Sequence, residues 1–354
     1  MSIPTEPIGS IPRPRYLLDA MADFAAGRVD QRELDRLTDQ ALSETIARLE
    51  ATGSPVVTDG EQAKPSFATY PLAGVDGLAP DGVVIPFADG HTRQLPRLTA
   101  GPFRYGTYAV SHYNRAAKIA HRPVKQAVIA PSALSLLYPA EGIAGYPREA
   151  FLADLVDESE KDIRQCLDAG AASVQLDFTE ARLSLKLSPS KELLREFIAL
   201  NNEVLSRFTA QERARIGVHT CPGSDQDSAH SLDVDYTELL PDLLTLRAGS
   251  FYLQLASEAE PAAALKVVRD HSAEDQRIFV GVIDPIDARV ETAEEVRDRV
   301  LEAAGHIPVE RLGTCDDCGF SPFADDTSTS REIAFAKIEA RVRGTRMAAE
   351  QLGL

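Results

Sequence analysis

The chain alternates short apolar segments with longer amphipathic stretches, and this alternation is the feature that most constrains its fold. The apolar segments are continuous rather than polar at every second position, which is typical of strands buried on both faces of a parallel sheet. Helical periodicity fills the stretches between them. We expect strands at 55–60, 125–131, 173–177, 215–219, 250–255 and 277–283, and helices at 31–52, 148–169, 190–208, 292–304 and 330–351.

Repeated β–α units leave two main architectures, an open doubly wound sheet and a closed (β/α)₈ barrel. The length of 354 residues suits two domains, or one barrel of roughly 250 residues or more with insertions. No Gly-x-Gly-x-x-Gly loop and no P-loop is present, so the best sequence evidence for a nucleotide-binding open sheet is missing. The Gly- and Pro-rich segment 70–104 predicts a β-rich insertion rather than a separate domain.

Charge and composition narrow the classes of partner. Lys and Arg number 37 and Asp and Glu 54, giving a net charge of −17, which argues against nucleic acid and against an anionic membrane surface. No apolar run approaches the ~18 residues of a membrane span. The first residues, 1–6, lack the pattern of a secretory signal, and four cysteines are too few for a disulfide scaffold. We expect a cytoplasmic protein that acts on small molecules; the oligomeric state stays open.

Polar residues cluster where the expected strands end. In a barrel the carboxyl ends of the strands converge on one mouth, where active sites are built. The residues at or just beyond these ends are Asp59, Glu61, Asp177, His219, Cys221 and Asp284.

A His-x-Cys pair and a Cys-x-x-Cys pair together indicate a metal site. His219 and Cys221 lie two positions apart, so in an extended chain their side chains point the same way. Cys315 and Cys318 form the second pair. Alone, the first pair is compatible with buried core residues and the second with a redox pair. Together at two strand ends they favour an ion such as Zn²⁺, which takes imidazole nitrogen and thiolate sulfur. Cys166 lies in an expected helix, where a small buried side chain is the simplest interpretation.

Several short motifs, in order along the chain, carry a family resemblance. The chain resembles the catalytic half of cobalamin-independent methionine synthase and its shorter single-barrel relatives, in a superfamily that includes the epoxyalkane:coenzyme M transferases and, more distantly, uroporphyrinogen decarboxylase. The matching segments are Pro7-Ile8-Gly9-Ser10-Ile11-Pro12-Arg13-Pro14, Thr58-Asp59-Gly60-Glu61, Val174-Gln175-Leu176-Asp177, Val218-His219-Thr220-Cys221, Gly281-Val282-Ile283-Asp284 to Arg289, and Asp316-Asp317-Cys318-Gly319.

The resemblance implies a (β/α)₈ barrel over residues 1–354 as one catalytic domain, with zinc at the mouth. It assigns His219, Cys221 and Cys318 as zinc ligands and leaves Cys315 outside the match. Glu258 is the candidate fourth ligand, although no acid falls cleanly in register there. By the same carry-over the thiol substrate would be held by two groups of residues: its backbone by Ile8, Gly9 and Ser10, and its amino group by Glu61 and Asp177.

Two motifs depart from the family pattern. Asp284-Pro285-Ile286 stands where the methionine synthases have Asp-Ile-His, so Ile286 replaces the histidine implicated as proton donor. Asp177-Phe178-Thr179-Glu180 stands where they have Asp-Glu-Pro. Both changes put methyltetrahydrofolate in question as the methyl donor. Asp284 remains a candidate catalytic residue, and His230 is an alternative proton donor, although its loop context favours a solvated side chain.

The expected activity is zinc-dependent transfer of a methyl or other alkyl group to a homocysteine-like thiol, from a donor that the sequence does not name. Three alternatives remain. Coenzyme M-type epoxide opening would need a cation for the sulfonate, supplied by Arg13, Lys64, Lys125 or Arg182. A zinc-free decarboxylase or lyase of the uroporphyrinogen type would leave the histidine and cysteines as packing. A non-enzymatic zinc-storing or thiol-binding protein would show no turnover.

Overall fold

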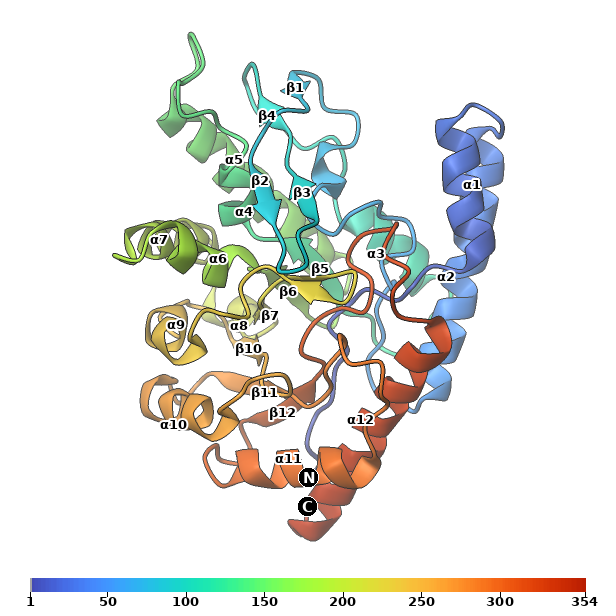
Figure 1. Cartoon of the computed structure of the whole chain (residues 1–354), viewed down its shortest axis with the longest axis vertical. Coiled ribbons are helices and arrows are strands. Elements are labelled where there is room, and N and C mark those ends of the chain that lie inside the picture. The colour runs from blue at the N-terminus through green and yellow to red at the C-terminus, as the bar shows by residue number, and fades with distance from the viewer. Residues whose placement is uncertain (1) are drawn as a thin grey trace.

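The computed structural model describes residues 2–354; Met1, which the domain prediction includes, lies outside the described residues. Within that range the largest sheet has six parallel strands in the order β12-β11-β10-β7-β6-β5 (Figure 1). Their bounds are β5 Gln126–Ile129, β6 Val174–Asp177, β7 Ile216–Thr220, β10 Ser250–Leu253, β11 Arg277–Gly281 and β12 Leu312–Cys315.

Two further extended segments close this sheet into a barrel. Thr5 pairs in parallel with Thr314 of β12, and Val57 pairs in parallel with Val124, next to β5. The two segments meet each other where Ile11 N donates to the carbonyl of Gly60 at 3.0 Å. The predicted α/β barrel is therefore confirmed, and the open doubly wound alternative is wrong.

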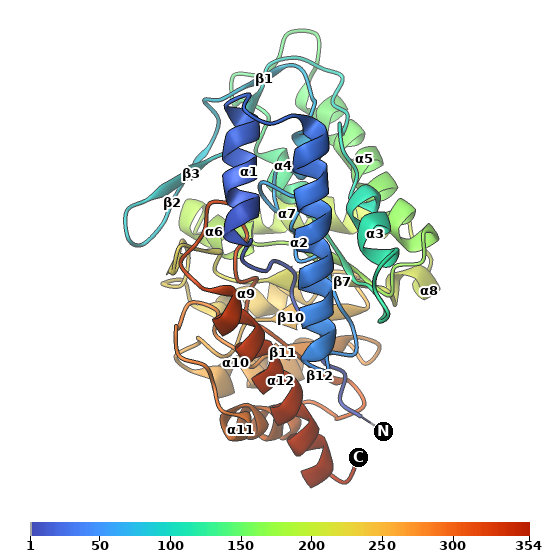
Figure 2. The same cartoon turned by 90° about the vertical axis from the view of Figure 1, so that its right-hand side faces the viewer.

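The helices surround the barrel. Figure 1 shows α7, α9, α10 and α11 following one another around one side of the sheet. Figure 2 shows α1 and α2 side by side on another, with α12 below α1. None of the helices within residues 2–354 is long and apolar enough to cross a membrane. Their bounds are α1 Arg15–Ala25, α2 Gln31–Ala51, α3 Val110–Ala117, α4 Pro131–Ser135, α5 Arg148–Asp168, α6 Glu180–Leu187, α7 Glu192–Leu205, α8 Ala210–Arg213, α9 Tyr236–Leu243, α10 Pro261–His271, α11 Ala293–Ala304 and α12 Arg331–Gln351.

All five predicted helices are present to within about three residues at each end, as expected for element boundaries. Strand β12 is absent from the sequence prediction, because Leu312-Gly313-Thr314-Cys315 is neither strongly apolar nor β-branched throughout. Tertiary packing explains its glycine: a Cβ at Gly313 would overlap the ring of Phe279 on the neighbouring strand. The first barrel segment, around Thr5, was likewise not predicted. It joins the sheet through a single bridge, so it is too short to show a strand pattern in the sequence.

The predicted insertion forms two small antiparallel pairs above the barrel. β1 (Leu78–Ala79) pairs with β4 (Arg97–Leu98), and β2 (Val84–Pro86) pairs with β3 (Thr92–Gln94). Figure 2 shows the β2–β3 hairpin projecting to one side of the molecule. The insertion lies between the Val57 segment and β5 in the sequence. It therefore begins at the carboxyl end of the Val57 segment, which is at the mouth of the barrel.

Helices α11 and α12 pack closely because α12 carries a glycine at their contact. A Cβ at Gly344 would overlap Val296 and approach the carbonyl of Ala293 at 2.6 Å. We predict that Gly344→Ala lowers the thermal midpoint measured by circular dichroism. The overpacking should destabilise the fold by about 1–3 kcal/mol, which outweighs the stabilisation of about 1 kcal/mol from the higher helix propensity of alanine. Arg343→Ala, on the exposed face of the same helix, is the control and should leave the midpoint unchanged. A Gly344→Ala protein as stable as the wild type would contradict this account of the packing.

Candidate active site

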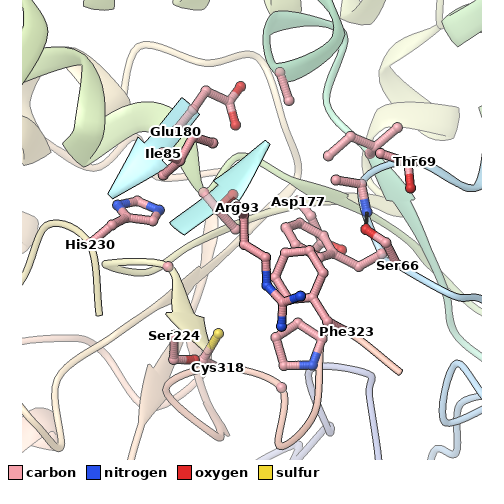
Figure 3. A pocket seen from close by; sticks show the side chains of 18 of the residues that line it. Ser66, Thr69, Ile85, Arg93, Asp177, Glu180, Ser224, His230, Cys318 and Phe323 are labelled. Carbon is pink, nitrogen blue, oxygen red and sulfur yellow. Dashed lines mark hydrogen bonds between the residues drawn. The ribbon is translucent and has the colours of Figure 1, made fainter. Parts of the chain in front are cut away.

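A cavity of about 360 Å³ opens at the carboxyl ends of the barrel strands, beneath the insertion (Figure 3). This is the end where parallel β–α barrels carry their sites. Segments from distant parts of the chain contribute to its wall. The sequence-predicted residues that line it are Ile8, Gly9, Ser10, Glu61, Asp177, His219, His230 and Cys318.

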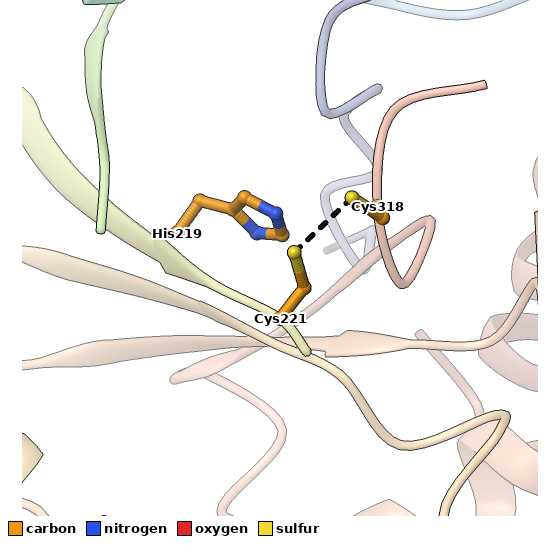
Figure 4. A group of neighbouring side chains, drawn as sticks. All are labelled: His219, Cys221 and Cys318. Carbon is orange, nitrogen blue, oxygen red and sulfur yellow. Dashed lines mark hydrogen bonds between the residues drawn. The ribbon is translucent and has the colours of Figure 1, made fainter. Parts of the chain in front are cut away.

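His219, Cys221 and Cys318 form a compact group at this cavity, with His219 and Cys318 on its wall (Figure 4). His219 lies in β7, Cys221 follows that strand directly, and Cys318 lies in the loop after β12. One ligand atom from each of the three lies within 4.8 Å of the others, and the two sulfur atoms are 3.1 Å apart. All three side chains are buried. The structure thus brings together the three ligands that the sequence predicted.

The polar contacts of this group suit a metal ion. Neither ring nitrogen of His219 has a hydrogen-bond partner among residues 2–354, although both are buried. A buried polar atom normally has a hydrogen-bond partner, so the lack of partners for these two nitrogens needs an explanation. Burial raises the pKa of Cys221, whereas the hydrogen bond from Cys221 lowers the pKa of Cys318. One imidazole and two sulfur ligands form the donor set that zinc prefers.

Two other candidates for the metal lie elsewhere. The carboxylate of Glu258 is not in the group; it accepts from Arg182 Nη1 at 2.6 Å. Cys315 lies inside the barrel, where its sulfur is 3.7 Å from the carbonyl oxygen of Phe279. The structure therefore clusters three candidate metal ligands within residues 2–354 and does not bring Glu258 or Cys315 to them.

Glu61 is held at the cavity wall by buried cations. Its backbone adopts a left-handed φ of 56°, directly after the turn that ends the Val57 segment. Its carboxylate accepts from Lys64 Nζ at 3.1 Å, and its carbonyl accepts from Arg13 Nη2 at 2.7 Å. Burial raises the pKa of Glu61, and the Lys64 charge opposes this shift. The side chain is thus rigidly placed and already has one cation partner.

Asp177 ends β6 on the same wall and forms no ion pair with a Lys or Arg among residues 2–354. Burial raises its pKa to about 7; the charge of His219 lowers it, and the nearby carboxylate of Glu61 raises it further. Its Oδ1 accepts from Gln175 Nε2 at 2.7 Å. Two buried carboxyl groups that repel each other in one cavity favour a ligand with a positive charge.

The segment from Ile8 to Ser10 is fixed on the wall by hydrogen bonds from three directions. Gln175 Nε2 donates to the carbonyl of Ile8 at 3.1 Å, and the hydroxyl of Thr58 donates to the carbonyl of Gly9 at 2.9 Å. The backbone N–H of Ser321 donates to Ser10 Oγ at 3.1 Å. These bonds join the start of the chain to two barrel strands and to the loop after Cys318.

The two predicted catalytic residues differ in position. The expectation of a solvated His230 is wrong: the side chain is buried on the cavity wall, with Nδ1 2.6 Å from Ser231 Oγ. The antiparallel pair β8 (Ser224–Asp225) and β9 (Ser228–Ala229) carries it there. Burial lowers the pKa of His230 to about 4. Asp284 is half-buried and is not among the residues that line the cavity; its Oδ1 accepts from Ile286 N at 3.0 Å.

The contribution of the insertion to the site was not predicted from the sequence. Phe87 and Arg93, from its β2–β3 hairpin, line the cavity, as does the buried Glu180 at the start of α6. Glu180 accepts from Ser132 Oγ, and burial raises its pKa to about 8. A signal for the hairpin was available, because a loop that leaves the chain at the carboxyl end of a barrel strand lies on the catalytic face.

Arg93 fastens the hairpin over the cavity. Its guanidinium makes paired hydrogen bonds to Asp225, at 2.5 and 3.0 Å, and to Asp325, at 2.9 Å twice. Asp225 lies four residues after Cys221, and Asp325 lies seven after Cys318. His91 Nε2, from the same hairpin, is 3.0 Å from Asp225 Oδ2. The β2–β3 hairpin, which forms the roof of the cavity, is therefore bound to the loop after Cys221 and to the loop after Cys318.

Comparison with known proteins identifies the family. A model described as "Cobalamin-independent synthase, Catalytic domain" matches residues 3–339. The chain belongs to this family. The resemblance seen in the motifs is thereby confirmed.

Similar proteins in this family match almost the whole chain. A methionine synthase of Saccharolobus islandicus is 22% identical over 351 residues, covering 99% of this chain and 96% of its own. One from Sulfolobus acidocaldarius is 24% identical, with 99% and 93% covered. A B12-independent methionine synthase from Shewanella sp. W3-18-1, in complex with selenomethionine, superimposes with a TM-score of 0.79 at 20% identity, with 99% of each chain covered. A putative B12-independent methionine synthase from Listeria monocytogenes gives 0.73 at 21%, with 98% of each covered. These structures show the same fold.

We predict that Arg93→Met loosens the β2–β3 hairpin over the cavity. Loss of four charge-assisted hydrogen bonds leaves the buried Asp225 without its guanidinium partner. Backbone amides within residues 84–94 should exchange with deuterium about tenfold faster or more, as measured by mass spectrometry. Arg97→Met is the matched control, because Arg97 pairs with the exposed Asp81 of the same insertion. Equal exchange in both variants would show that Arg93 does not hold the hairpin.

Proposed function

We propose that this protein, acting as one catalytic domain over residues 1–354, transfers a methyl group to a homocysteine-like amino thiol at a zinc site formed by His219, Cys221 and Cys318. The observation that carries the proposal is the juxtaposition of this nitrogen and sulfur group with two buried carboxyl groups, Glu61 and Asp177, on one cavity. One end of the cavity suits a metal that binds sulfur. The other suits an ammonium group.

Zinc fits the three residues by their chemistry and by the two unpartnered ring nitrogens of His219. A zinc ion bound there would lower the pKa of an incoming thiol, so that it is present as the nucleophilic thiolate. If these three residues held the ion, a fourth position would be left for the substrate, as in catalytic rather than structural sites. Because the two cysteines are buried, their sulfur atoms would be protected from side reactions with solvent.

Glu61 and Asp177 would bind the amino group of the thiol. An ammonium between them offsets the repulsion between their carboxylates and favours the ionised form of each. Ile8, Gly9 and Ser10 would line the amino-acid end of the substrate, since their backbone is fixed beside both carboxyl groups. This orients the thiol end towards Cys318 and His219.

The methyl donor would lie under the hairpin, where the wall is mainly apolar. The side chains there include Ile85, Phe87, Leu95 and Leu183. In the reaction the sulfur–methyl bond forms as the bond from methyl to donor breaks, and the electron pair of that bond leaves with the donor. An apolar wall excludes water from the thiolate, which keeps its nucleophilicity high.

A coenzyme M-type substrate fits this cavity less well. Each of the four basic residues that the sequence suggested for a sulfonate already has partners, and Arg93 on the cavity wall is paired with Asp225 and Asp325. Arg13 donates to backbone carbonyls, Lys64 is paired with Glu61, and Arg182 is paired with Glu258. Lys125 donates to Gln175 below the cavity. The membership in the synthase family also favours methyl transfer over decarboxylation. The names of the relatives, and the selenomethionine bound to one of them, are consistent with a methionine-forming reaction.

We predict one zinc per chain in the purified protein, measured by inductively coupled plasma mass spectrometry. Cys221→Ser and Cys318→Ser should each lower the zinc content about tenfold or more, because a serine hydroxyl is a poor zinc ligand compared with thiolate. Cys315→Ser and Cys166→Ser are matched controls, since both cysteines are buried outside the group and should retain zinc. Zinc lost equally from all four variants, or absent from the wild type, would contradict the site.

We also predict that Asp177→Asn weakens homocysteine binding to the zinc-loaded protein by about tenfold or more. The neutral amide removes the charge that pairs with the ammonium group, while the size of the side chain is kept. The dissociation constant is measured by isothermal titration calorimetry, with zinc content checked in parallel. Asp284→Asn, at a carboxylate that does not line the cavity, serves as the comparison and should bind homocysteine as the wild type does. Equal losses in the two variants would argue against a specific role for Asp177.

A further inference from the structure

A buried polar group lies inside the barrel, below the cavity, and the proposed mechanism does not use it. Lys125 precedes β5 and Gln175 lies in β6; both side chains are fully buried. Neither lines the cavity. Burying an amine inside a barrel is unfavourable unless it has partners, so its contacts indicate what it does there.

The contacts of Lys125 lead towards the active site. Its Nζ donates to Gln175 Oε1 at 2.8 Å and lies 4.1 Å from the centre of the Tyr252 ring. Glu6 Oε2, which accepts from the Tyr252 hydroxyl at 2.6 Å, is 3.5 Å from the same nitrogen. Burial lowers the pKa of Lys125, and Glu6 opposes the shift. Lys125 thus donates the hydrogen bond that the side-chain amide oxygen of Gln175 accepts.

Gln175 passes this constraint to the cavity wall. Its Nε2 donates to Asp177 Oδ1 at 2.7 Å and to the carbonyl of Ile8 at 3.1 Å. The orientation of the amide is determined at both ends, because a backbone carbonyl can only accept and the amide nitrogen must therefore face Ile8. Both hydrogens of the amide are used, and its oxygen is satisfied by Lys125.

We propose that Lys125 is a positioning residue which, through Gln175, places the Asp177 carboxylate and the Ile8 carbonyl so that the site selects a thiol that carries an amino group. This inference rests on the proposed function, since it concerns how that site recognises its substrate. Without Lys125 the buried amide oxygen of Gln175 has no hydrogen-bond donor. A rotation or shift of the amide that brings the oxygen to another donor would then lower the free energy. Either movement removes a hydrogen bond from Asp177 or Ile8.

The test compares two thiols that differ only in the amino group, homocysteine and 4-sulfanylbutanoate, by isothermal titration calorimetry on zinc-loaded protein. We expect the wild type to prefer homocysteine and the preference to fall about tenfold in Lys125→Met and in Gln175→Met. In the double variant the fall should be no larger than in Gln175→Met, because both changes break one chain of contacts. Thr314→Val is the control, since it removes a different buried hydrogen bond, to Thr345, and should keep the preference.

A purely structural role gives a different result. Lys125→Met would then lower the thermal midpoint, weaken both thiols equally and leave the preference at its wild-type value, which overturns the proposal. Additive losses in the double variant would overturn it as well.

A second measurement needs no substrate and separates this inference from the proposed function. The side-chain amide signal of Gln175, assigned in the NMR spectrum by its absence from Gln175→Met, should lose protection from hydrogen exchange in Lys125→Met and keep it in Thr314→Val. An unchanged signal would overturn the positioning role. A wild type that fails to bind homocysteine would count against the proposed function alone.

Discussion

Closure of the parallel barrel is the constraint on which the rest of this structure depends. The cysteines at 221 and 318 are 97 residues apart in the chain, yet their sulfur atoms lie 3.1 Å apart because both follow strands that end at the same mouth. Closure depends on two short segments, around Thr5 and Val57, which are joined to their neighbours by single bridges. The first of these leads directly into Ile8–Ser10. A segment that joins the barrel through a single bridge thus also leads into part of the cavity wall.

Burial of charge distinguishes the floor of the site from its wall. Below the cavity and around it, buried cations have acceptors: Lys64 binds Glu61, Arg341 binds Asp316, and Arg13 binds backbone carbonyls. On the wall, Asp177 lacks a cation and His219 lacks any hydrogen-bond partner within residues 2–354. A buried carboxyl group without a cation and a buried imidazole without a hydrogen bond are features typical of functional sites. These two residues face the positions proposed for the ammonium and the metal.

Much of this arrangement could be predicted from the sequence, and the failures have physical causes. The continuous apolar segments predicted five of the six strands of the main sheet, and the spacing of His219 and Cys221 placed two candidate ligands together at the end of one strand. Strand β12 was missed because Gly313, which has low strand propensity, is required there by close packing against the ring of Phe279. His230 was misplaced because nothing local in Asp227-Ser228-Ala229-His230 reveals that a short hairpin turns it inwards. The roles of Arg93, Lys125 and Gln175 depend on partners more than 45 residues away, which local patterns do not encode.

The central claim is that one imidazole and two sulfur atoms bind a zinc ion and leave a place for the thiol. Zinc K-edge X-ray absorption on the purified protein, with and without homocysteine, tests it most directly. The account predicts two sulfur ligands at about 2.3 Å and one nitrogen at about 2.0–2.1 Å in the free protein, and a third sulfur at a similar distance when homocysteine is added. A first shell of nitrogen and oxygen alone, or a sulfur count that homocysteine does not change, would contradict it.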